Sequence, residues 1–396
     1  MAARFTRDAP VRGRMLGAGR LLFATLDRRP PGQRGHPELV GIGAFDAETG
    51  QPLWQNYGLP PLAATGAGRL YGYGRAGVLV CLGFDGLQRW RLDVPDDRSA
   101  PARTRGDSHG PFAADVVTGG GQVVVAAGPE VIAVDAETGR IWARAPAAQG
   151  TRAVADRLAD AGDALICTST QRTDIDLELE RDEPELWRNP RPPEQWRTAP
   201  GELIGLDRRL AQRWRAGPPH EHLALAGRRP ACVAGLVMVP ATGIRSDASG
   251  RWRSSFGHRL LAFDAATGAA RWDAALPSGP GAFDPVPLAA GAVLGGHPAL
   301  HDAATGGIRW RLEPSIPVEA DLEPVPVNGQ VLFVGRGAVV AVDVSDGSAR
   351  PLPDVSIPRD GKIVAGPVCA GDTLYLGLWR GGRPTQLCAY PLAFGG

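Results

Sequence analysis

Short apolar runs alternate along the chain with turns rich in glycine, asparagine and aspartate. Residues 283–296 ("FDPVPLAAGAVLGG") and 322–335 ("LEPVPVNGQVLFVG") each contain two apolar stretches around a glycine-centred turn. Val-, Leu- and Ala-rich stretches separated by Gly or Asn-Gly are typical of β-hairpins. The pattern therefore predicts an all-β chain of antiparallel strands.

A second phrase follows each hairpin: an apolar run, an Asp, a Thr-Gly turn and a Trp. Residues 44–54 read "AFDAETGQPLW". The Asp and Thr side chains can cap the turn, and Gly supplies its positive φ. Closer and looser copies stand at 83–90, 133–142, 205–214, 262–272, 300–310 and 341–350, and the run at 387–396 keeps the strand without the turn. With the preceding hairpins, these eight copies predict eight four-stranded antiparallel units.

Four-stranded units repeated along a chain make a β-propeller, a ring that hides its sheet edges by closing. The predicted fold class is an all-β, eight-bladed β-propeller of four-stranded antiparallel blades, with residues 1–396 forming a single domain. Residues 3–8 belong to no unit of their own. We expect this N-terminal strand to complete the last blade; the alternative is a frayed tail.

The Ala-x-Asp-x-x-Thr-Gly-x-x-x-Trp phrase resembles the tryptophan-docking repeat of the pyrroloquinoline-quinone-type (PQQ-like) propellers. That family includes the quinoprotein alcohol dehydrogenases and the propeller lipoprotein of bacterial outer-membrane assembly. In the family, the Trp of each outer strand packs against the neighbouring blade. The resemblance implies such contacts for six residues: Trp54, Trp90, Trp142, Trp214, Trp272 and Trp310.

Cofactor motifs of the quinoprotein enzymes are missing from this sequence. No two of the five cysteines are adjacent, and no Glu/Asn/Asp set suggests a calcium site. These departures argue against PQQ and against a quinone-dependent dehydrogenase. The sequence predicts no organic cofactor, and a bound divalent metal ion is the alternative to having no cofactor at all.

Charge and cysteine usage limit the partners and the compartment. The formal net charge is +1 without a basic or acidic run, so neither nucleic acid nor a membrane surface is expected as a partner. No apolar signal region opens the chain, and no apolar run is long enough to cross a membrane. An odd, scattered set of cysteines indicates free thiols in a reducing compartment. We therefore expect a cytoplasmic bacterial protein, monomeric by itself.

The four strands of each unit are lettered A to D in chain order, with A and B around the glycine turn and C and D around the Asp-Thr-Gly turn. Long insertions fall on the B–C and D–A connections, which emerge on one face of a propeller. They cover residues 26–38, 95–111, 171–202, 217–229 and 242–258. Loops of this length are uncommon in compact domains unless they carry function or are disordered. We expect this loop-rich face to bind the partner, with the acidic and Trp/Arg/Pro-rich 171–202 insertion as the best single candidate.

Candidate binding and metal residues lie in these insertions. The loop tryptophans Trp187, Trp196 and Trp252 are candidates for ligand contact, the alternative being that they cover a neighbouring blade. The candidate metal ligands are His109, His220, His222 and His258. His220 and His222 have the i, i+2 spacing that can chelate a metal, but solvated loop histidines would show the same pattern.

Charged residues also recur at equivalent positions of the predicted innermost strands, a few residues before the glycine of each turn. They are Asp115, Asp156, Arg229, Asp284 and Glu323. Such a set could bind a cation or a polar ligand at the channel mouth, or simply line a water-filled channel. His301 replaces an apolar residue before Asp302 and is expected to be a hydrogen-bonded core histidine.

Two functions remain compatible with these observations. The first is a non-catalytic scaffold that binds a protein or peptide partner through the loop-rich face. It is favoured because the chain has no nucleophile elbow, phosphate loop or strongly spaced metal motif. The alternative is an enzyme, a lyase or hydrolase, metal-assisted or not, with its site at the channel mouth on the same face.

Overall fold

The computed structural model describes most of the chain as strands, turns and short connections. The described residues are 3–28, 40–74, 77–94, 116–146, 153–171, 201–220, 223–225, 229–246, 252–276, 285–294, 298–313, 322–335, 337–352, 355, 357–358, 361–380 and 385–392. All regular structure in these ranges is β-strand. They accordingly contain no helix that could cross a membrane.

The strands of the described residues form seven sheets. The largest has the order β1-β33-β32-β31-β2-β3-β4-β5. Its strands are β1 (Phe5–Asp8), β33 (Gln386–Pro391), β32 (Thr373–Trp379), β31 (Lys362–Ala370), β2 (Val11–Ala18), β3 (Leu21–Asp27), β4 (Val40–Asp46) and β5 (Pro52–Tyr57). A single parallel pair, Gly13 with Ala365, joins its two antiparallel four-stranded halves.

The other six sheets follow in chain order. Three are β6 (Leu62–Gly66), β7 (Arg69–Gly74), β8 (Val78–Gly83), β9 (Gln88–Asp93); β10 (Val116–Gly119), β11 (Gln122–Ala127), β12 (Glu130–Asp135), β13 (Ile141–Pro146); and β14 (Ala153–Asp160), β15 (Ala164–Gln171), β16 (Glu202–Asp207), β17 (Gln212–Ala216). The next is β18 (Leu223–Leu225), β19 (Ala231–Val233), β20 (Leu236–Ser246), β21 (Trp252–Asp264), β22 (Ala270–Leu276). The last two are β23 (Val286–Leu288), β24 (Gly291–Leu294), β25 (Ala299–Asp302), β26 (Ile308–Arg311); and β27 (Val325–Val327), β28 (Gln330–Gly335), β29 (Ala338–Asp343), β30 (Ala349–Pro351).

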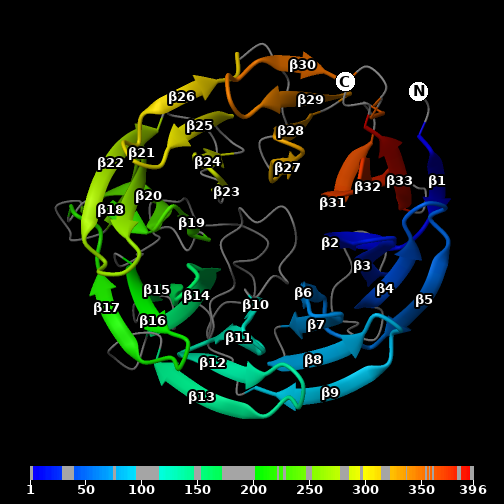
Figure 1. The fold of residues 1–396 in the computed structure, drawn as a ribbon, viewed down its shortest axis with the longest axis horizontal. Coiled ribbons are helices and arrows are strands. Elements are labelled where there is room, and N and C mark those ends of the chain that lie inside the picture. Colours follow the sequence, from blue (N-terminus) through cyan, green and yellow to red (C-terminus); the bar gives the residue numbers. More distant parts are fainter. Residues whose placement is uncertain are drawn as a thin grey trace.

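The sheets stand side by side in a ring around a central opening (Figure 1). β2, β6, β10, β14 and β31 are among the innermost strands, and β5, β9, β13, β17 and β22 are among the outermost. The predicted all-β fold of four-stranded antiparallel units is confirmed. The predicted role of the N-terminal residues is also observed, because β1 pairs with β33 from Phe5–Ala389 to Asp8–Gln386.

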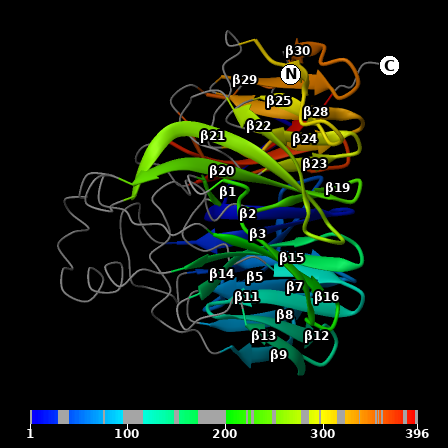
Figure 2. The ribbon, with the colours of Figure 1, turned by 90° about the vertical axis from the view of Figure 1, so that its left-hand side faces the viewer.

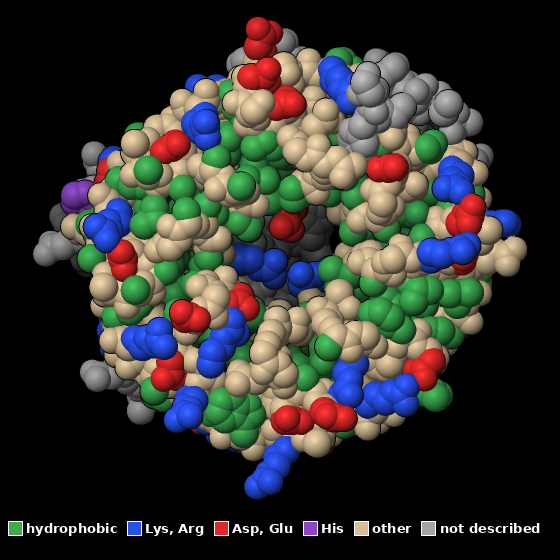
Figure 3. Space-filling view, viewed as in Figure 1, with side chains coloured by type: hydrophobic (Ala, Val, Ile, Leu, Met, Phe, Trp, Pro, Cys, Tyr) green, Lys and Arg blue, Asp and Glu red, His purple; other side chains and the backbone are tan. Residues whose placement is uncertain are grey.

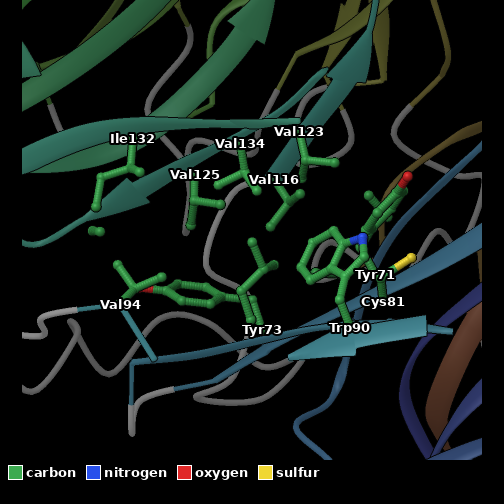
Figure 4. Close-up of a cluster of buried hydrophobic side chains, with 14 residues drawn as sticks. Tyr71, Tyr73, Cys81, Trp90, Val94, Val116, Val123, Val125, Ile132 and Val134 are labelled. Carbon is green, nitrogen blue, oxygen red and sulfur yellow. The ribbon is translucent and has the colours of Figure 1, made fainter. Parts of the chain in front are cut away.

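The hydrophobic core is divided among the junctions between neighbouring sheets. At the junction of β6–β9 with β10–β13, Tyr71 and Trp90 come from one sheet and Val123, Val125 and Ile132 from the next (Figure 4). All five side chains are buried. Each sheet thus buries apolar residues against both neighbours, which is how a ring without a central core is held together.

Every full Asp-Thr-Gly turn uses the same hydrogen bonds. Asp46 Oδ1 accepts from the backbone N–H of Glu48 at 3.0 Å and of Thr49 at 2.8 Å, and from the Thr49 hydroxyl at 2.8 Å. Gly50 follows with a φ of 70°, which favours glycine. These bonds hold the pKa of Asp46 below its ordinary value. Asp135, Asp264 and Asp302 accept the same three hydrogen bonds, from the hydroxyl and N–H of the Thr and from the N–H of the residue before it.

Five of the six predicted tryptophan contacts are confirmed. In each, the indole N–H donates to a backbone carbonyl of the next sheet, and the ring lies over the positive-φ glycine of that sheet's turn. A Cβ added to Gly86 would be 2.7 Å from the Trp54 ring. We call each such contact a clasp. The pairs are Trp54–Gly86, Trp90–Gly139, Trp214–Gly268, Trp272–Gly306 and Trp310–Gly347.

The prediction that Trp142 forms a clasp is wrong. Its side chain is 42% exposed. Two residues separate Gly139 from Trp142, whereas three separate Gly268 from Trp272. Residue 143, not 142, is therefore opposite Ala133, as Trp272 is opposite Ala262. Because side chains alternate along a strand, the missing residue turns Trp142 outward.

An aromatic contact that the sequence did not reveal takes the place of a clasp within the eight-stranded sheet. A Cβ on Gly50 would be 2.2 Å from the Phe5 ring, so Phe5 occupies the place that a tryptophan takes elsewhere. Phe5 comes from β1, and its ring centroid is 6.3 Å from that of Tyr375 in β32. The Tyr375 hydroxyl donates to the Ala47 carbonyl at 2.5 Å. The N-terminal strand thus adds both hydrogen bonds and an aromatic contact.

Candidate functional site

Many of the predicted site residues lie outside the described residues. These are Asp115, Asp284, Trp187, Trp196, His109 and His222, with most of the insertions 26–38, 95–111 and 171–202 and a smaller part of 217–229. Asp156 lies in β14 and Trp252 in β21, and only their backbones are described. Their assignment to a binding site stays a prediction.

The two described candidate metal ligands lie in or beside the sheet β18–β22. His258 is in β21, opposite Thr242 and Leu276 in the ladder. His220 is exposed, and its Nε2 is 3.2 Å from Oδ2 of Asp273 in β22. Among the residues that the structure describes, no group of three or more His, Cys, Asp or Glu side chains could hold a metal ion.

Asp273 connects His220 to an arginine. Its Oδ1 accepts a hydrogen bond from the Arg259 guanidinium. Burial acts to raise the pKa of Asp273, but the hydrogen bond and charge of Arg259 outweigh it and hold that pKa below its ordinary value. Asp273 is therefore an ionised acceptor between a histidine and an arginine. This arrangement ties the connection after β17 to β22.

Arginines and a lysine are prominent among the described residues of the innermost strands. Arg12 and Arg14 lie in β2, Arg157 in β14 and Lys362 in β31. Figure 3 shows Lys and Arg side chains inside the central opening. These cations lie at other positions of the strands than the predicted charged residues, so the sequence pattern did not reveal them.

Two of the predicted channel residues are described. Arg229 is half-buried just before β19, and Glu323 is exposed just before β27. His301 is buried in β25, and its Nδ1 donates to the Gly306 carbonyl at 3.2 Å. This confirms the prediction of a hydrogen-bonded core histidine.

A two-stranded ribbon is the main described feature outside the ring. β20 and β21 have 11 and 13 residues and project beyond the other strands (Figure 2). Their pairing runs from Leu236–Asp264 out to Ser246–Trp252. β18 pairs with β20 only at residues 241–243, and β22 pairs with β21 only from His258 inward. Within the described ranges, the outer part of the ribbon thus has no further strand on either edge.

The ring of antiparallel sheets, the Asp-Thr-Gly turns and the tryptophan clasps define a PQQ-type β-propeller. The sequence profile of the family described as outer membrane protein assembly factor BamB matches residues 40–285 and 257–382. The chain belongs to this family.

Solved structures agree with this fold. BamB from Moraxella catarrhalis is similar with a TM-score of 0.58 and 12% identity, covering 99% of this chain and 98% of that one. The Dos1 propeller has a TM-score of 0.60 and 10% identity, with 98% and 94% coverage. No curated protein sequence matches the chain. At these identities the structural likeness shows the fold alone.

Proposed function

We propose that this protein is a non-catalytic scaffold that binds a protein or peptide partner through the face carrying the B–C and D–A connections. The observation that carries the proposal is the β20–β21 ribbon, a B–C hairpin that extends beyond the ring on that face. Open strand edges can accept an extended peptide by main-chain hydrogen bonding. The BamB-like fold supports the proposal, because propellers of this kind commonly mediate protein interactions.

The proposal includes eight blades, with the eight-stranded sheet counted as two. Its two halves are each antiparallel and four-stranded, and the one parallel pair between Gly13 and Ala365 supports a division there. It also includes a cytoplasmic location without a resident cofactor. The five free cysteines support the reducing compartment, since three are buried and two half-buried.

The experiment is to shorten the ribbon. Residues 244–256 are replaced by Asn-Gly, which forms a two-residue hairpin turn between Gly243 and Gly257. The intact and shortened proteins are compared by quantitative affinity capture from the native host, after their thermal melts have been matched. The matched control is Leu53→Ser/Ile308→Ser, which changes two exposed side chains of outer strands and leaves the ribbon intact.

We expect the shortened protein to lose a defined set of partners that the intact and control proteins both retain. Full retention of every partner by the folded, shortened protein would overturn the proposal.

A further inference from the structure

Phe84 occupies a turn position at which the other clasps have a small residue. Its carbonyl accepts the hydrogen bond from the Trp54 indole N–H at 2.8 Å. In the other four clasps the accepting residues are Ala136, Ala265, Ala303 and Val344. The clasp needs only the carbonyl of this residue, so the phenylalanine ring is an addition at this turn. Its centroid is 4.8 Å from that of the buried Phe23.

Leu87 is a second apolar addition to the same turn. Its carbonyl closes the turn by accepting a hydrogen bond from the Gly83 N–H at 2.9 Å. The residues that close the other turns in this way are polar or small: Gln51, Arg140, Ala211, Ala269, Gly307 and Ser348. The Leu87 side chain is 61% exposed, more than any other exposed large hydrophobic residue of the described ranges. This turn therefore presents two apolar side chains that its geometry does not require.

These side chains belong to a larger apolar surface. Leu21, Trp54 and Phe84 are half-buried and pack on one buried cluster at the junction of β2–β5 with β6–β9. The Trp54 ring lies over Gly86, which directly precedes Leu87. We call Leu21, Trp54, Phe84 and Leu87 the Leu87 patch. It lies on the face opposite the β20–β21 ribbon, and Figure 3 shows hydrophobic side chains gathered on that face over β3, β4 and β5.

The charged side chains around the Leu87 patch balance one another. The four turns that border it, residues 18–21, 46–52, 66–69 and 83–89, contain three arginines and three carboxylates: Arg20, Arg69, Arg89, Asp46, Glu48 and Asp85. Glu48 pairs with Arg20 at 2.9 Å and also with Arg4 of β1, and Arg89 pairs with Asp85 at 2.6 Å. Arg69 donates to the Ala136 carbonyl at 2.6 Å, and Asp46 accepts the hydrogen bonds of its own turn. The border of the patch therefore favours neither an acidic nor a basic partner.

The main-chain acceptors of the Phe84–Leu87 turn are already used within the protein. The Phe84 and Gly86 carbonyls accept from the side chains of Trp54 and Asn56, at 2.8 and 2.6 Å, and the Leu87 carbonyl accepts within the turn. An extended segment binds by main-chain hydrogen bonds, which these carbonyls do not offer. A helix satisfies its own main chain and presents only side chains. The patch therefore fits a helix better than a strand.

We propose that the Leu87 patch binds the apolar face of an amphipathic helix from a partner protein, with an apolar side chain of that helix packed on Phe84 and Leu87. Exposed apolar patches mark interaction sites, and a helix binds such a patch through a few anchors at i, i+3, i+4 and i+7 spacing. A second copy of this chain fits less well, because stable dimers use about 20–30 residues a side. The patch and the β20–β21 ribbon lie on opposite faces, so the test does not depend on the ribbon.

The experiment selects peptides from a phage library of randomised amphipathic helices, with the full chain as target and Leu87→Ser as the counter-target. We expect the enriched peptides to have aromatic or aliphatic residues at helical spacing, without an excess of either charge. By fluorescence anisotropy, Leu87→Ser and Phe84→Ala should each weaken binding of an enriched peptide about tenfold or more. Added salt should change the affinity little, because the proposed contact contains no ion pair to be screened.

Ile308→Ser is the matched control, since it changes an exposed aliphatic side chain of β26, in another sheet, and should leave binding unchanged. Leu87→Ser should keep the melting temperature of the parent because its side chain is exposed, so loss of binding in that variant is not unfolding. The proposal is overturned if no enriched peptide depends on Leu87, or if the enriched peptides show no helix by circular dichroism when bound. It is also overturned if sedimentation velocity shows that the chain self-associates and that Leu87→Ser abolishes this, since the occupant would then be a second copy.

Discussion

Ala143 and Leu210 pack into one apolar cluster between neighbouring sheets, where five other junctions pair a tryptophan with a glycine. Ala143 occupies the register position of the clasp tryptophan, and Leu210 occupies that of the glycine. Leu210 even keeps the positive φ, at 62°. At this junction the small residue, Ala143, thus stands where other junctions have a large tryptophan, and the large residue, Leu210, stands where they have a small glycine.

This exchange predicts strong coupling between the two positions. Ala143→Trp alone should be destabilising because Leu210 already fills the space, and Leu210→Gly alone should leave a cavity. The double variant Ala143→Trp/Leu210→Gly restores the clasp combination. It should be more stable than the sum of the single changes predicts, by about 1 kcal/mol or more. Urea denaturation of the four proteins measures this, and simple additivity would show that the two residues do not share the site.

Clasp tryptophans should contribute much more to stability than Trp142. Trp214 and Trp310 are each 7% exposed and hydrogen-bonded to the next sheet. Replacing either by Ala should cost about 3–5 kcal/mol. Trp142→Ala should cost less than about 1 kcal/mol, as for other exposed positions. The measurement is chemical denaturation at fixed temperature, and equal losses in the two classes would contradict the clasp assignment.

The turn aspartates should make the protein sensitive to acid. Hydrogen bonds from Thr or Ser hydroxyls and from backbone N–H groups lower the pKa of Asp46, Asp135, Asp302 and Asp343. Arg271 and then Thr267 lower that of Asp264 to about 2, from an ordinary value of 3.8. Because these pKa values are lower in the folded chain, their stabilisation is complete above pH 3.8 and is lost as the pH falls toward 2.

Melting temperatures measured from pH 6 to pH 2 would test this prediction. Asp264→Asn should be less stable than the parent at pH 6 and should lose less on acidification. Glu323→Gln, which removes an exposed carboxylate outside the turns, is the matched control. A parent-like acid profile in the Asp264→Asn variant would show that this turn is not a source of the acid sensitivity.

The cysteines should react slowly in the native protein. Burial raises the pKa of Cys232 and of Cys369 to about 12, and it also raises those of Cys81 and Cys388. The thiolate is the reactive form, so little of it exists near neutral pH. Titration with a thiol reagent at pH 8 should be slow in buffer and rapid in denaturant. Fast labelling of the folded protein would contradict the burial of these thiols.

Local turn chemistry explains why so much of the fold could be predicted. The Asp, Thr and Gly of each full phrase lie within five residues of one another, and the Asp and Thr hydrogen bonds with the positive φ of the Gly specify the turn locally. The error at Trp142 arose because one residue is missing between Gly139 and that Trp, which reverses the direction of the side chain. The residue types of the phrase are the same with either spacing, so they alone do not reveal which way the Trp points.

Other features depend on residues that are far apart in sequence. Phe5 and Gly50 meet only after the N-terminal strand has joined β33, and no local motif marks Phe5 as a clasp residue. The ion pairs of Asp273 with His220 and Arg259 likewise join three strands or connections. The ribbon corresponds to the predicted 242–258 insertion. Its long backbone pairing could not be predicted from the sequence, because it depends on how β20 and β21 pair in the folded sheet.

The pairing of β1 with β33 sets an order for biosynthesis. Asp8 and Gln386 meet in one sheet, although 378 residues separate them. A growing chain therefore emerges from the ribosome with β1 as an unpaired strand, and it stays so until the codons for β33 have been translated. Closure of the ring must therefore wait until β33 has been synthesised. During that interval the nascent β1 strand presents an open edge to other chains, so co-translational protection of this strand has the greatest value for the yield of folded protein.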